Sequence, residues 1–271
     1  MSPSVSRLQL ERWAIAAWPA LEEIAYDGWI LRFADGHTKR SNCVNPLRES
    51  TAELDEKIAI CERAYAERGL PTVFRLTPFS EPSSLDDALA DLGYEAIDRT
   101  WVMTRPLGDL PTLGSIDGVE SVDLASWLDA FERLGVLPPD EMAVRREILS
   151  RIPSETIPLA AGPTDRPAGV NLGVHDGEAV GLFSLYVAPE RRREGVGRAL
   201  VEKALQIAAD RGAAIAYLQV EATNGPARAL YAKLGFFDAY PYWYRVRRDE
   251  PETSGPTSAK GTDLDYRPGG L

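Results

Sequence analysis

The stretch LYVAPERRREGVGRALVEKAL, residues 185–205, changes its periodicity partway along. Before Pro189, the run AVGLFSLYV from residue 179 is apolar and partly β-branched, which is typical of a buried strand. After Pro189, apolar residues recur every three to four positions up to Gly212, which predicts an amphipathic helix that ends at this glycine. The sequence therefore predicts a strand, a tight loop and a helix in direct succession.

The loop between this strand and this helix has the composition of an anion site. Gly195 and Gly197 permit a sharp turn and leave backbone N–H groups uncovered, beside the positive end of the helix dipole. Arg192 and Arg193 add positive charge at the rim. A Walker loop would require Gly-Lys-Ser/Thr, which is absent, and a dinucleotide fingerprint would require a small residue where Leu200 stands.

The spacing Arg192-x-x-Gly195-x-Gly197 resembles the pyrophosphate loop of the GCN5-related N-acetyltransferases (the GNAT superfamily), which holds the diphosphate of coenzyme A. For this loop alone, a basic helix start with a flexible turn is the alternative interpretation. Downstream, the sequence predicts a strand over 214–221, a helix that begins after Asn224, and a last strand from about Tyr240. The resemblance then covers roughly residues 117–248.

The resemblance implies acetyl-coenzyme A as the co-substrate and assigns residues to its site. In the family, two strands separate to admit the pantetheine arm, and strand backbone N–H groups polarise the acetyl carbonyl. The expected contacts with the coenzyme are Leu185, Tyr186, Val187, Arg192, Arg193, Gly195, Val196, Gly197, Arg198, Asn224 and Tyr231. For Arg198 the backbone amide is the expected contributor, since the side chain equally suits a solvated helix surface. Asn224 equally suits a helix cap.

Tyr231 and Glu221 are the candidate catalytic residues. The family places a tyrosine at the Tyr231 position, where a phenol can protonate the leaving thiolate, although helical spacing also suits a core tyrosine. Many members carry a glutamate on the strand before the loop, but LFSLYV offers only Ser184 and Tyr186. Glu221 is therefore the candidate general base, against the alternatives of an exposed strand-end acid and of proton loss to water. Tyr240, Tyr242 and Tyr244 suit either an acceptor site or packing.

The first half of the chain repeats the order of strands and helices of the second half. At one constant offset, VNP (44–46) matches VAP (187–189) and Gly69 matches Gly212. At an offset shorter by a single position, Leu92-Gly93-Tyr94 matches Leu234-Gly235-Phe236 and Trp101 matches Trp243. We expect an α/β (α+β) fold of two tandem GNAT-like domains, each a mixed, mostly antiparallel sheet flanked by helices. In the first half TKRSNCVN is expected to be a strand.

The two halves differ at the anion loop. At the positions equivalent to Arg192, Gly195 and Gly197, the first half has Glu49, Ala52 and Leu54. At the position equivalent to Tyr231 it has Leu89. The first half is therefore expected to be a degenerate domain that does not bind coenzyme A. The expected boundaries are a degenerate domain over 1–107, a linker over 108–118, an acetyltransferase domain over 119–248 and a disordered tail over 249–271.

Composition narrows the classes of partner. The 271 residues carry a formal net charge of −11, which disfavours nucleic acid and makes a cationic amine a reasonable acceptor hypothesis. Cys43 and Cys61 lack metal spacing, and His37 and His175 lie in turn-like contexts where exposed histidines are expected, so no metal is predicted. Neither a signal peptide nor a membrane span is recognisable, and we expect a cytoplasmic protein without a membrane partner.

The leading hypothesis is an acetyl-CoA-dependent N-acetyltransferase that moves the acetyl group directly to a primary amine of a small molecule or peptide. The alternative is a catalytically silent acyl-CoA-binding module with a regulatory or interaction role. An intact loop together with Tyr231 favours the enzyme, whereas the missing strand glutamate favours the silent module. A homodimer is left open.

Overall fold

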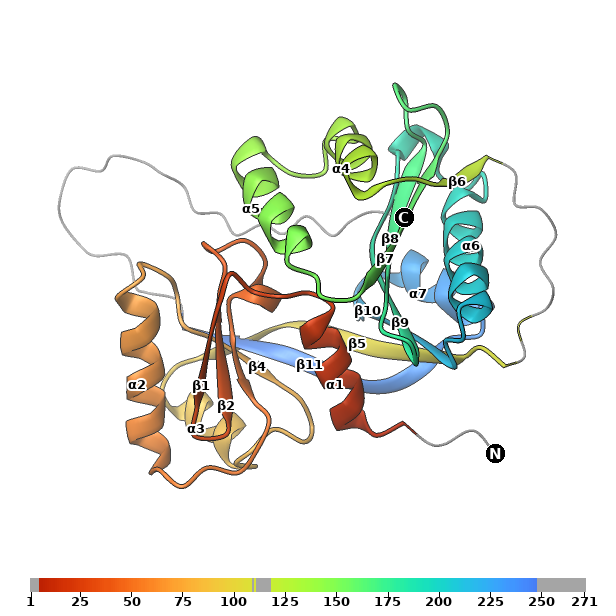
Figure 1. Cartoon of the computed structure of the whole chain (residues 1–271). Coiled ribbons are helices and arrows are strands. Elements are labelled where there is room, and N and C mark those ends of the chain that lie inside the picture. Colours follow the sequence, from red (N-terminus) through yellow and green to blue (C-terminus); the bar gives the residue numbers. More distant parts are fainter. Residues whose placement is uncertain (1–4, 109, 111–117, 248–271) are drawn as a thin grey trace.

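The structure is a computed structural model and describes residues 5–108, 110 and 118–247 (Figure 1). Most of the expected linker 108–118 and the whole expected tail 249–271 lie outside the described residues. The first half contains α1 (Arg7–Ala16), β1 (Glu22–Tyr26), β2 (Trp29–Phe33), the 3-10 turn η1 (Lys39–Ser41), β3 (Val44–Pro46), α2 (Leu54–Ala66), β4 (Val73–Leu76), α3 (Leu85–Asp91) and β5 (Glu95–Pro106).

The second half repeats this order after one added strand and one added helix. It contains β6 (Val119–Ser121), α4 (Leu124–Arg133), α5 (Pro139–Ser150), β7 (Glu155–Ala161), β8 (Gly169–His175), β9 (Ala179–Val187), the 3-10 turn η2 (Pro189–Arg191), α6 (Val196–Asp210), β10 (Ile215–Glu221), α7 (Gly225–Lys233) and β11 (Phe237–Val246). The predicted succession of buried strand, tight loop and helix is confirmed by β9, η2 and α6. The last strand begins at Phe237, slightly before its predicted start at Tyr240.

All described strands form one sheet in the order β1-β2-β3-β4-β11-β5-β10-β9-β8-β7-β6. The order is nearly the same from either end, as expected of two related halves. The last strands are exchanged between the halves: β11 pairs with β4 of the first half, and β5 pairs with β10 of the second. Figure 1 shows these two long strands side by side, crossing from one half to the other.

Two pairs of strands, β3 with β4 and β9 with β10, are parallel, and the other pairs are antiparallel. Each parallel pair is joined through a helix, α2 or α6, as a parallel crossover requires. The predicted class, α/β with a mixed and mostly antiparallel sheet flanked by helices, is confirmed. The domain boundaries stay a prediction.

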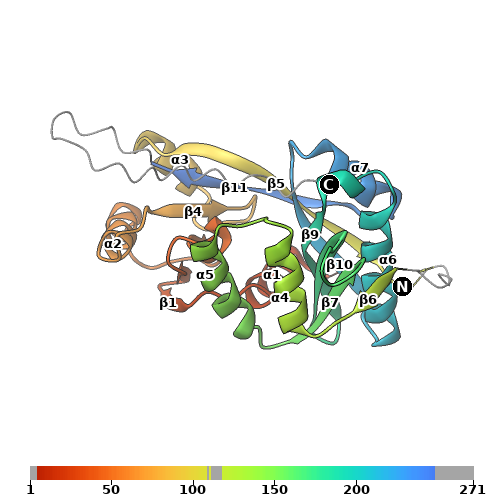
Figure 2. The same cartoon turned by 90° about the horizontal axis from the view of Figure 1, so that it is seen from above.

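Three apolar clusters hold helices against the sheet. α2 and α3 cover the first half, and α6 and α7 cover the second half. A third cluster, under α1, α4 and α5, draws residues from both halves, including Trp13 of α1 and Tyr217 of β10, whose rings stack with centroids 6.4 Å apart. Figure 2 shows α1, α4 and α5 gathered on one side of β5 and β11.

The expected strand TKRSNCVN is wrong over most of its length. Lys39–Ser41 form a 3-10 turn, and pairing begins only at Val44. The cause is Asn42, whose side chain accepts hydrogen bonds from the backbone N–H groups of Ala34 and Gly36 and donates to the carbonyl of His37. Such side-chain bonds to the backbone replace the ladder of a strand.

Candidate active site

The two parallel strands of the second half separate partway along their length. β9 and β10 pair up to Leu182 and Leu218, and each strand then continues, to Val187 and Glu221, without further pairing between the two in the described chain. Where a ladder stops, backbone N–H and C=O groups become available to other partners. The opening lies at residues 185–187, where the pantetheine arm was predicted to enter.

A β-bulge lies on β9 at the edge of this opening. Two residues, Ser184 and Leu185, face the single residue Asn171 of β8, whose side-chain amide donates to the carbonyl of Phe183 at 3.1 Å. Ser184 has a φ of 50°, a left-handed conformation that is unusual for a residue other than glycine. A bulge releases a backbone N–H group from the ladder and changes its direction. The geometry therefore offers backbone donors beside the opening.

The glycine loop at the start of α6 has the form of an anion socket. Gly195 has a φ of 87° and is the N-cap residue, and a Cβ placed there would meet no heavy atom within 4 Å. Glycine is needed here for the backbone conformation rather than for space. The first backbone hydrogen bond of the helix runs from Ala199 to Gly195, so the amides of residues 196–198 precede it and point out of the helix end.

The arginines around this loop have separate partners. Arg191 pairs with Glu194 at 2.7 Å, and Arg198 pairs with Glu202 at 2.8 Å on the helix surface. The Arg198 side chain is thus a surface residue, and its backbone amide is the group that faces the socket end. Arg192 donates from Nε to the carbonyl of Val187, the last residue of β9, at 3.4 Å.

The two predicted residues that follow β10 are the N-cap of α7, Asn224, and Tyr231 within this helix. The Asn224 side chain accepts a hydrogen bond from the backbone N–H of Ala227 at 3.1 Å, so its capping role is confirmed. Tyr231 is 8% exposed, lies edge-on to Phe236 with ring centroids 5.9 Å apart, and belongs to the apolar cluster under α6 and α7. The structure therefore shows packing around Tyr231, and its role as an acid stays a prediction.

Glu221 ends β10 and is only partly exposed. Burial, and then the charge of Asp98, raise the pKa of its carboxyl group, while Lys39 opposes them. Lys39 and Asp98 form an ion pair of 3.0 Å, and both belong to the first half. A raised pKa suits a carboxylate that accepts a proton near neutral pH.

Tyr231 and Glu221 lie on opposite faces of the sheet. Side chains alternate along a strand, so Glu221 shares a face with Tyr217, in the cluster under α1. Val220 faces the other way, in the cluster that contains Tyr231. The α6 face, with its anion socket, suits the donor and its thiol, and the α1 face suits an acceptor amine.

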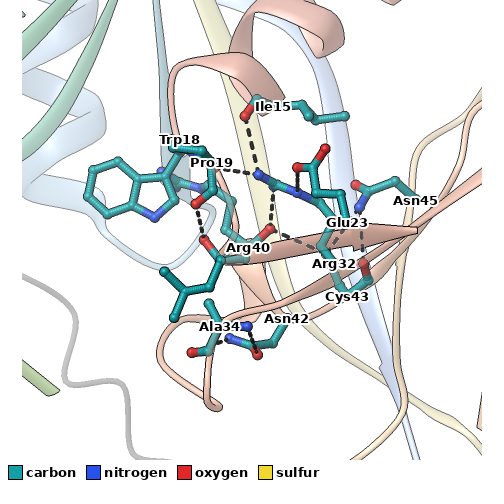
Figure 3. Close-up of polar contacts among 12 residues, drawn as sticks. Ile15, Trp18, Pro19, Glu23, Arg32, Ala34, Arg40, Asn42, Cys43 and Asn45 are labelled. Atoms are coloured by element: carbon teal, nitrogen blue, oxygen red, sulfur yellow. Dashed lines mark hydrogen bonds and ion pairs between the residues drawn. The ribbon is translucent and has the colours of Figure 1, made fainter. Parts of the chain in front are cut away.

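The first half contributes aromatic and cationic side chains to the packing on the α1 face. Trp18, which follows α1, stacks on Phe183 of β9 with centroids 5.4 Å apart, and the Arg40 guanidinium lies 5.6 Å from the same Phe183 ring. Figure 3 shows how Arg32 fixes this packing. Its guanidinium donates to the carbonyls of Ile15, Trp18 and Arg40 and to the carboxylate of Glu23.

The alternating tyrosines of β11 pack into this face. Tyr240, Tyr242 and Tyr244 are buried; Tyr240 donates to Glu11 at 2.6 Å and Tyr242 donates to Gln219 at 2.9 Å. Their burial favours packing over an acceptor-lining role. Beside them is a cavity of about 10 Å³, room for about one water molecule. It is lined by Glu11, Ala14, Ile15, Arg32, Arg40, Asn45, Arg75 and Gln219.

The loop of the first half that corresponds to the anion socket already holds an anion from the chain itself. The Asp27 carboxylate accepts from the backbone N–H groups of Ala52 and Thr51, at 2.9 Å each, and from the Thr51 hydroxyl. These bonds, that of Ala52 first, lower the pKa of Asp27 to about 2. Ala52 is the counterpart of Gly195, so this contact supports the expectation that the first half does not take coenzyme A.

The expectation of exposed histidines is wrong. His37 is 5% exposed and His175 is 7% exposed. His37 is buried because its turn packs against α5 of the second half, a contact between segments far apart in the sequence. In the described residues no cluster of three or more His, Cys, Asp or Glu side chains has the arrangement of a metal site, and no helix is long and apolar enough to cross a membrane.

The fold, the separated strands and the socket at α6 together define an acyltransferase of the GNAT superfamily. The family described as "Probable histone acetyltransferase Rv0428c C-terminal" matches residues 7–245, and the chain belongs to this family. The resemblance inferred from the loop is thereby confirmed, and the protein is an N-acetyltransferase.

Similar proteins agree over most of the chain. "Uncharacterized N-acetyltransferase YobR" of Bacillus subtilis is 30% identical over 89% of this chain and 98% of its own length. "Mycothiol acetyltransferase" of Catenulispora acidiphila is 31% identical over 54% of this chain and 53% of its own length. The structure of a GCN5-related N-acetyltransferase from Kribbella flavida, 15% identical, matches with a TM-score of 0.64 over 85% of this chain and 91% of that chain, and shows the same fold.

Sequence reasoning missed the residues that the first half brings to the bulge of β9. Trp18 and Arg40 of the first half contact Phe183, and Arg145 of α5 contacts Ser184. His37 of the first half reaches this group through Arg145. No local motif identifies them, because their positions depend on contacts between the halves. The local sequence around His37 is that of a turn whether the histidine is exposed or buried, so it does not predict burial.

Proposed function

We propose that this protein transfers the acetyl group of acetyl-CoA directly to a primary amine of a small molecule or peptide, in the opening between β9 and β10. The observation that supports this proposal is the coincidence of three features at one place: strands that separate, a bulge at Ser184, and a left-handed Gly195 at the start of α6. Each alone has a structural explanation. Their alignment along one strand and its following helix suits an extended acyl donor.

In this proposal the chain divides the chemistry between the two faces of the sheet. The amides at residues 196–198 hold the diphosphate, with Arg192 and Arg193 at the rim. Backbone N–H groups at the bulge stabilise the oxygen of the acetyl carbonyl as it becomes negative. The strands orient the thioester, and the α1 face admits the amine.

The proton balance assigns one residue to each face. The amine nitrogen forms a bond to the acetyl carbon, and the bond from that carbon to sulfur breaks. Glu221 accepts the proton that the amine loses, and Tyr231 donates a proton to the departing thiolate. The raised pKa of Glu221 supports the first role.

The names of the relatives and the side chains on the α1 face bear on the chemical class of the acceptor. One relative carries the name mycothiol acetyltransferase, which supports a small-molecule acceptor for the family. Trp18 and Phe183 are themselves 3% and 5% exposed, so their cluster with Arg40 is packing and, like the tyrosines of β11, identifies no acceptor. It therefore gives the cationic-acceptor hypothesis no support beyond the net charge.

Calorimetric titration of acetyl-CoA tests the donor site. We expect one equivalent to bind per chain, and Gly195→Asp to abolish binding, because the substitution strains the turn and places a carboxylate in the socket. The matched control is Gly177→Asp, at the other end of β9, where φ is 97° and a Cβ likewise meets nothing within 4 Å. If both variants bind like the wild type, the glycine loop is only the entrance of a helix and the proposal is wrong.

Turnover then distinguishes an enzyme from a silent module. With a panel of amines, we expect thiol release by the wild type and a loss of about 10² to 10⁴ in kcat for Tyr231→Phe, the usual range for a general acid. The phenylalanine keeps the packing against Phe236 and removes only the hydroxyl. Donor binding without thiol release on any amine would favour the silent acyl-CoA-binding module.

A further inference from the structure

The left-handed residue of the bulge is held from outside its own strand. The Ser184 hydroxyl accepts a hydrogen bond from Nη1 of Arg145 at 3.0 Å, and Arg145 lies on α5 and is 5% exposed. A non-glycine residue with φ near 50° persists only where its surroundings fix it. The bond from Arg145 is therefore one of the contacts that fix the bulge.

Arg145 is in turn oriented by the first half of the chain. Its Nε donates to Nε2 of His37 at 3.2 Å, while its guanidinium lies 5.0 Å from the ring centroids of both Trp18 and Phe131. The Nδ1 atom of His37 lies 3.0 Å from a carboxylate oxygen of Glu141, one turn before Arg145 on α5. His37 thus joins two side chains of α5 from a turn in the other half of the chain.

The protonation state of His37 follows from these contacts. A guanidinium can only donate, so Nε2 of His37 must accept, and the imidazole proton must sit on Nδ1, where it donates to Glu141. The imidazole is therefore neutral. Burial, and then the nearby charge of Arg145, lower the pKa of His37 to about 3, which keeps this form present at neutral pH.

We propose that His37 is a positioning residue for acyl transfer: it orients Arg145, which holds the bulge at Ser184 beside the opening between β9 and β10. This inference rests on the proposed function, because it assigns the bulge to the acetyl carbonyl. It also gives the first half a role. The first half, whose own anion loop is occupied by the Asp27 carboxylate, would fix the geometry of the bulge in the second half.

The test compares two substitutions of His37 in the full chain. His37→Gln retains an acceptor for Arg145 and a donor for Glu141, whereas His37→Leu removes both. We expect His37→Leu to lower kcat by about 10-fold to 100-fold, within the range that a misplaced catalytic geometry produces. The KM and Kd for acetyl-CoA should stay unchanged, because the socket at α6 is not touched, and His37→Gln should restore most of kcat.

His175→Leu is the matched control. His175 is also buried, at 7% exposed, but it lies on β8 at 3.7 Å from Glu155 and has no contact with Arg145 among the interactions described. If loss of a buried histidine acted only through stability, the two leucine variants would lower kcat alike. We expect only His37→Leu to do so.

Ser184→Ala supplies a second route if His37→Leu does not fold. It removes the other end of the chain of contacts and should by itself lower kcat. Where His37→Leu folds, the effects of the two substitutions on kcat should be less than additive. The inference is overturned by unchanged kcat in a folded His37→Leu or Ser184→Ala variant, by equal losses in His37→Gln and His37→Leu, or by additive effects. A wild type that neither binds acetyl-CoA nor releases thiol would instead overturn the proposed function, and this role with it.

Discussion

The backbone conformations of two residues, Gly195 and Ser184, shape the proposed site of the second half. Gly195 and Ser184 both have positive φ angles, on either side of the opening, but for different physical reasons. Glycine adopts the left-handed region at little cost, so the socket forms locally. Serine does not, so the bulge depends on side chains that reach it from elsewhere in the fold. The proposed donor site is thus built from local sequence, and the proposed reacting centre depends on tertiary contacts.

The buried His37 predicts how stability changes with pH. Its folded pKa of about 3 lies below its ordinary value of 6.5, so below pH 6.5 the unfolded chain binds a proton that the folded chain does not. Stability should therefore fall as the pH decreases through the window from 6.5 to 3. Between pH 7 and pH 5 the loss should be about 2 kcal/mol, at about 1.4 kcal/mol per pH unit.

Urea unfolding at pH 7 and pH 5 measures this loss, and His37→Gln is the control. The glutamine does not titrate, so the difference between the wild type and the variant isolates the histidine from the carboxyl groups. A parallel decrease in both proteins would show that His37 is not the group responsible.

At the scale of elements, the start of α7 combines a cap with a candidate coenzyme contact. The Asn224 oxygen accepts from the Ala227 amide, and replacing such a cap with alanine typically costs about 1 kcal/mol. Asn224→Ala should lower stability by about this amount, and Asn224→Ser, which keeps an oxygen acceptor, should restore most of it. Denaturant unfolding measures both variants.

The same variants separate the cap from the contact with coenzyme A. If Asn224 binds the coenzyme through its amide group, the serine variant should recover stability but not the Kd for acetyl-CoA. Recovery of affinity together with stability would limit Asn224 to capping.

Elements with local signals were predictable, and elements fixed by distant contacts were not. β9 and α6 are marked by a change of period at Pro189 and by Gly195 and Gly212. No such signal marks the turn at Lys39–Ser41, because the Asn42 side chain sets it through bonds to five backbone groups. Tyr231 was predicted from the family motif and Glu221 from its place at the end of a strand, and both stay predictions. Arg145 and His37 meet only when the halves pack.

At the scale of the whole molecule, the exchange of last strands was invisible to sequence reasoning. Trp101 and Trp243 match in the alignment of the two halves whether each strand returns to its own half or crosses to the other. In the structure, Trp243 donates to Asp86 of α3 in the first half, and Trp101 packs with the cluster under α6 and α7. The alternation of apolar and polar residues specifies which face of a strand is buried. It does not specify the neighbouring strand, because each of the two similar halves offers a similar partner.

The exchange should make the two halves unfold together. β11 lies between two strands of the first half and pairs with both β4 and β5. The buried ion pair between Glu11 of α1 and Arg75 of β4 is also bonded to Tyr240 of β11. Each half therefore contains a strand of the other. We expect a single cooperative transition rather than one for each half.

Matched core substitutions in the two halves test this cooperativity. Ile58 of α2 and Val201 of α6 occupy equivalent positions at the offset that matches VNP with VAP, and both are at most 1% exposed. Ile58→Ala should cost about 2–5 kcal/mol through the cavity it leaves, and this loss should reduce hydrogen-exchange protection in α6 as much as in α2. Val201→Ala should likewise lower protection in both helices. If Ile58→Ala exposes α2 and leaves α6 fully protected, the halves unfold independently and the exchanged strands do not couple them. Equal losses would mean that the second half, with the proposed site, is only as stable as the first.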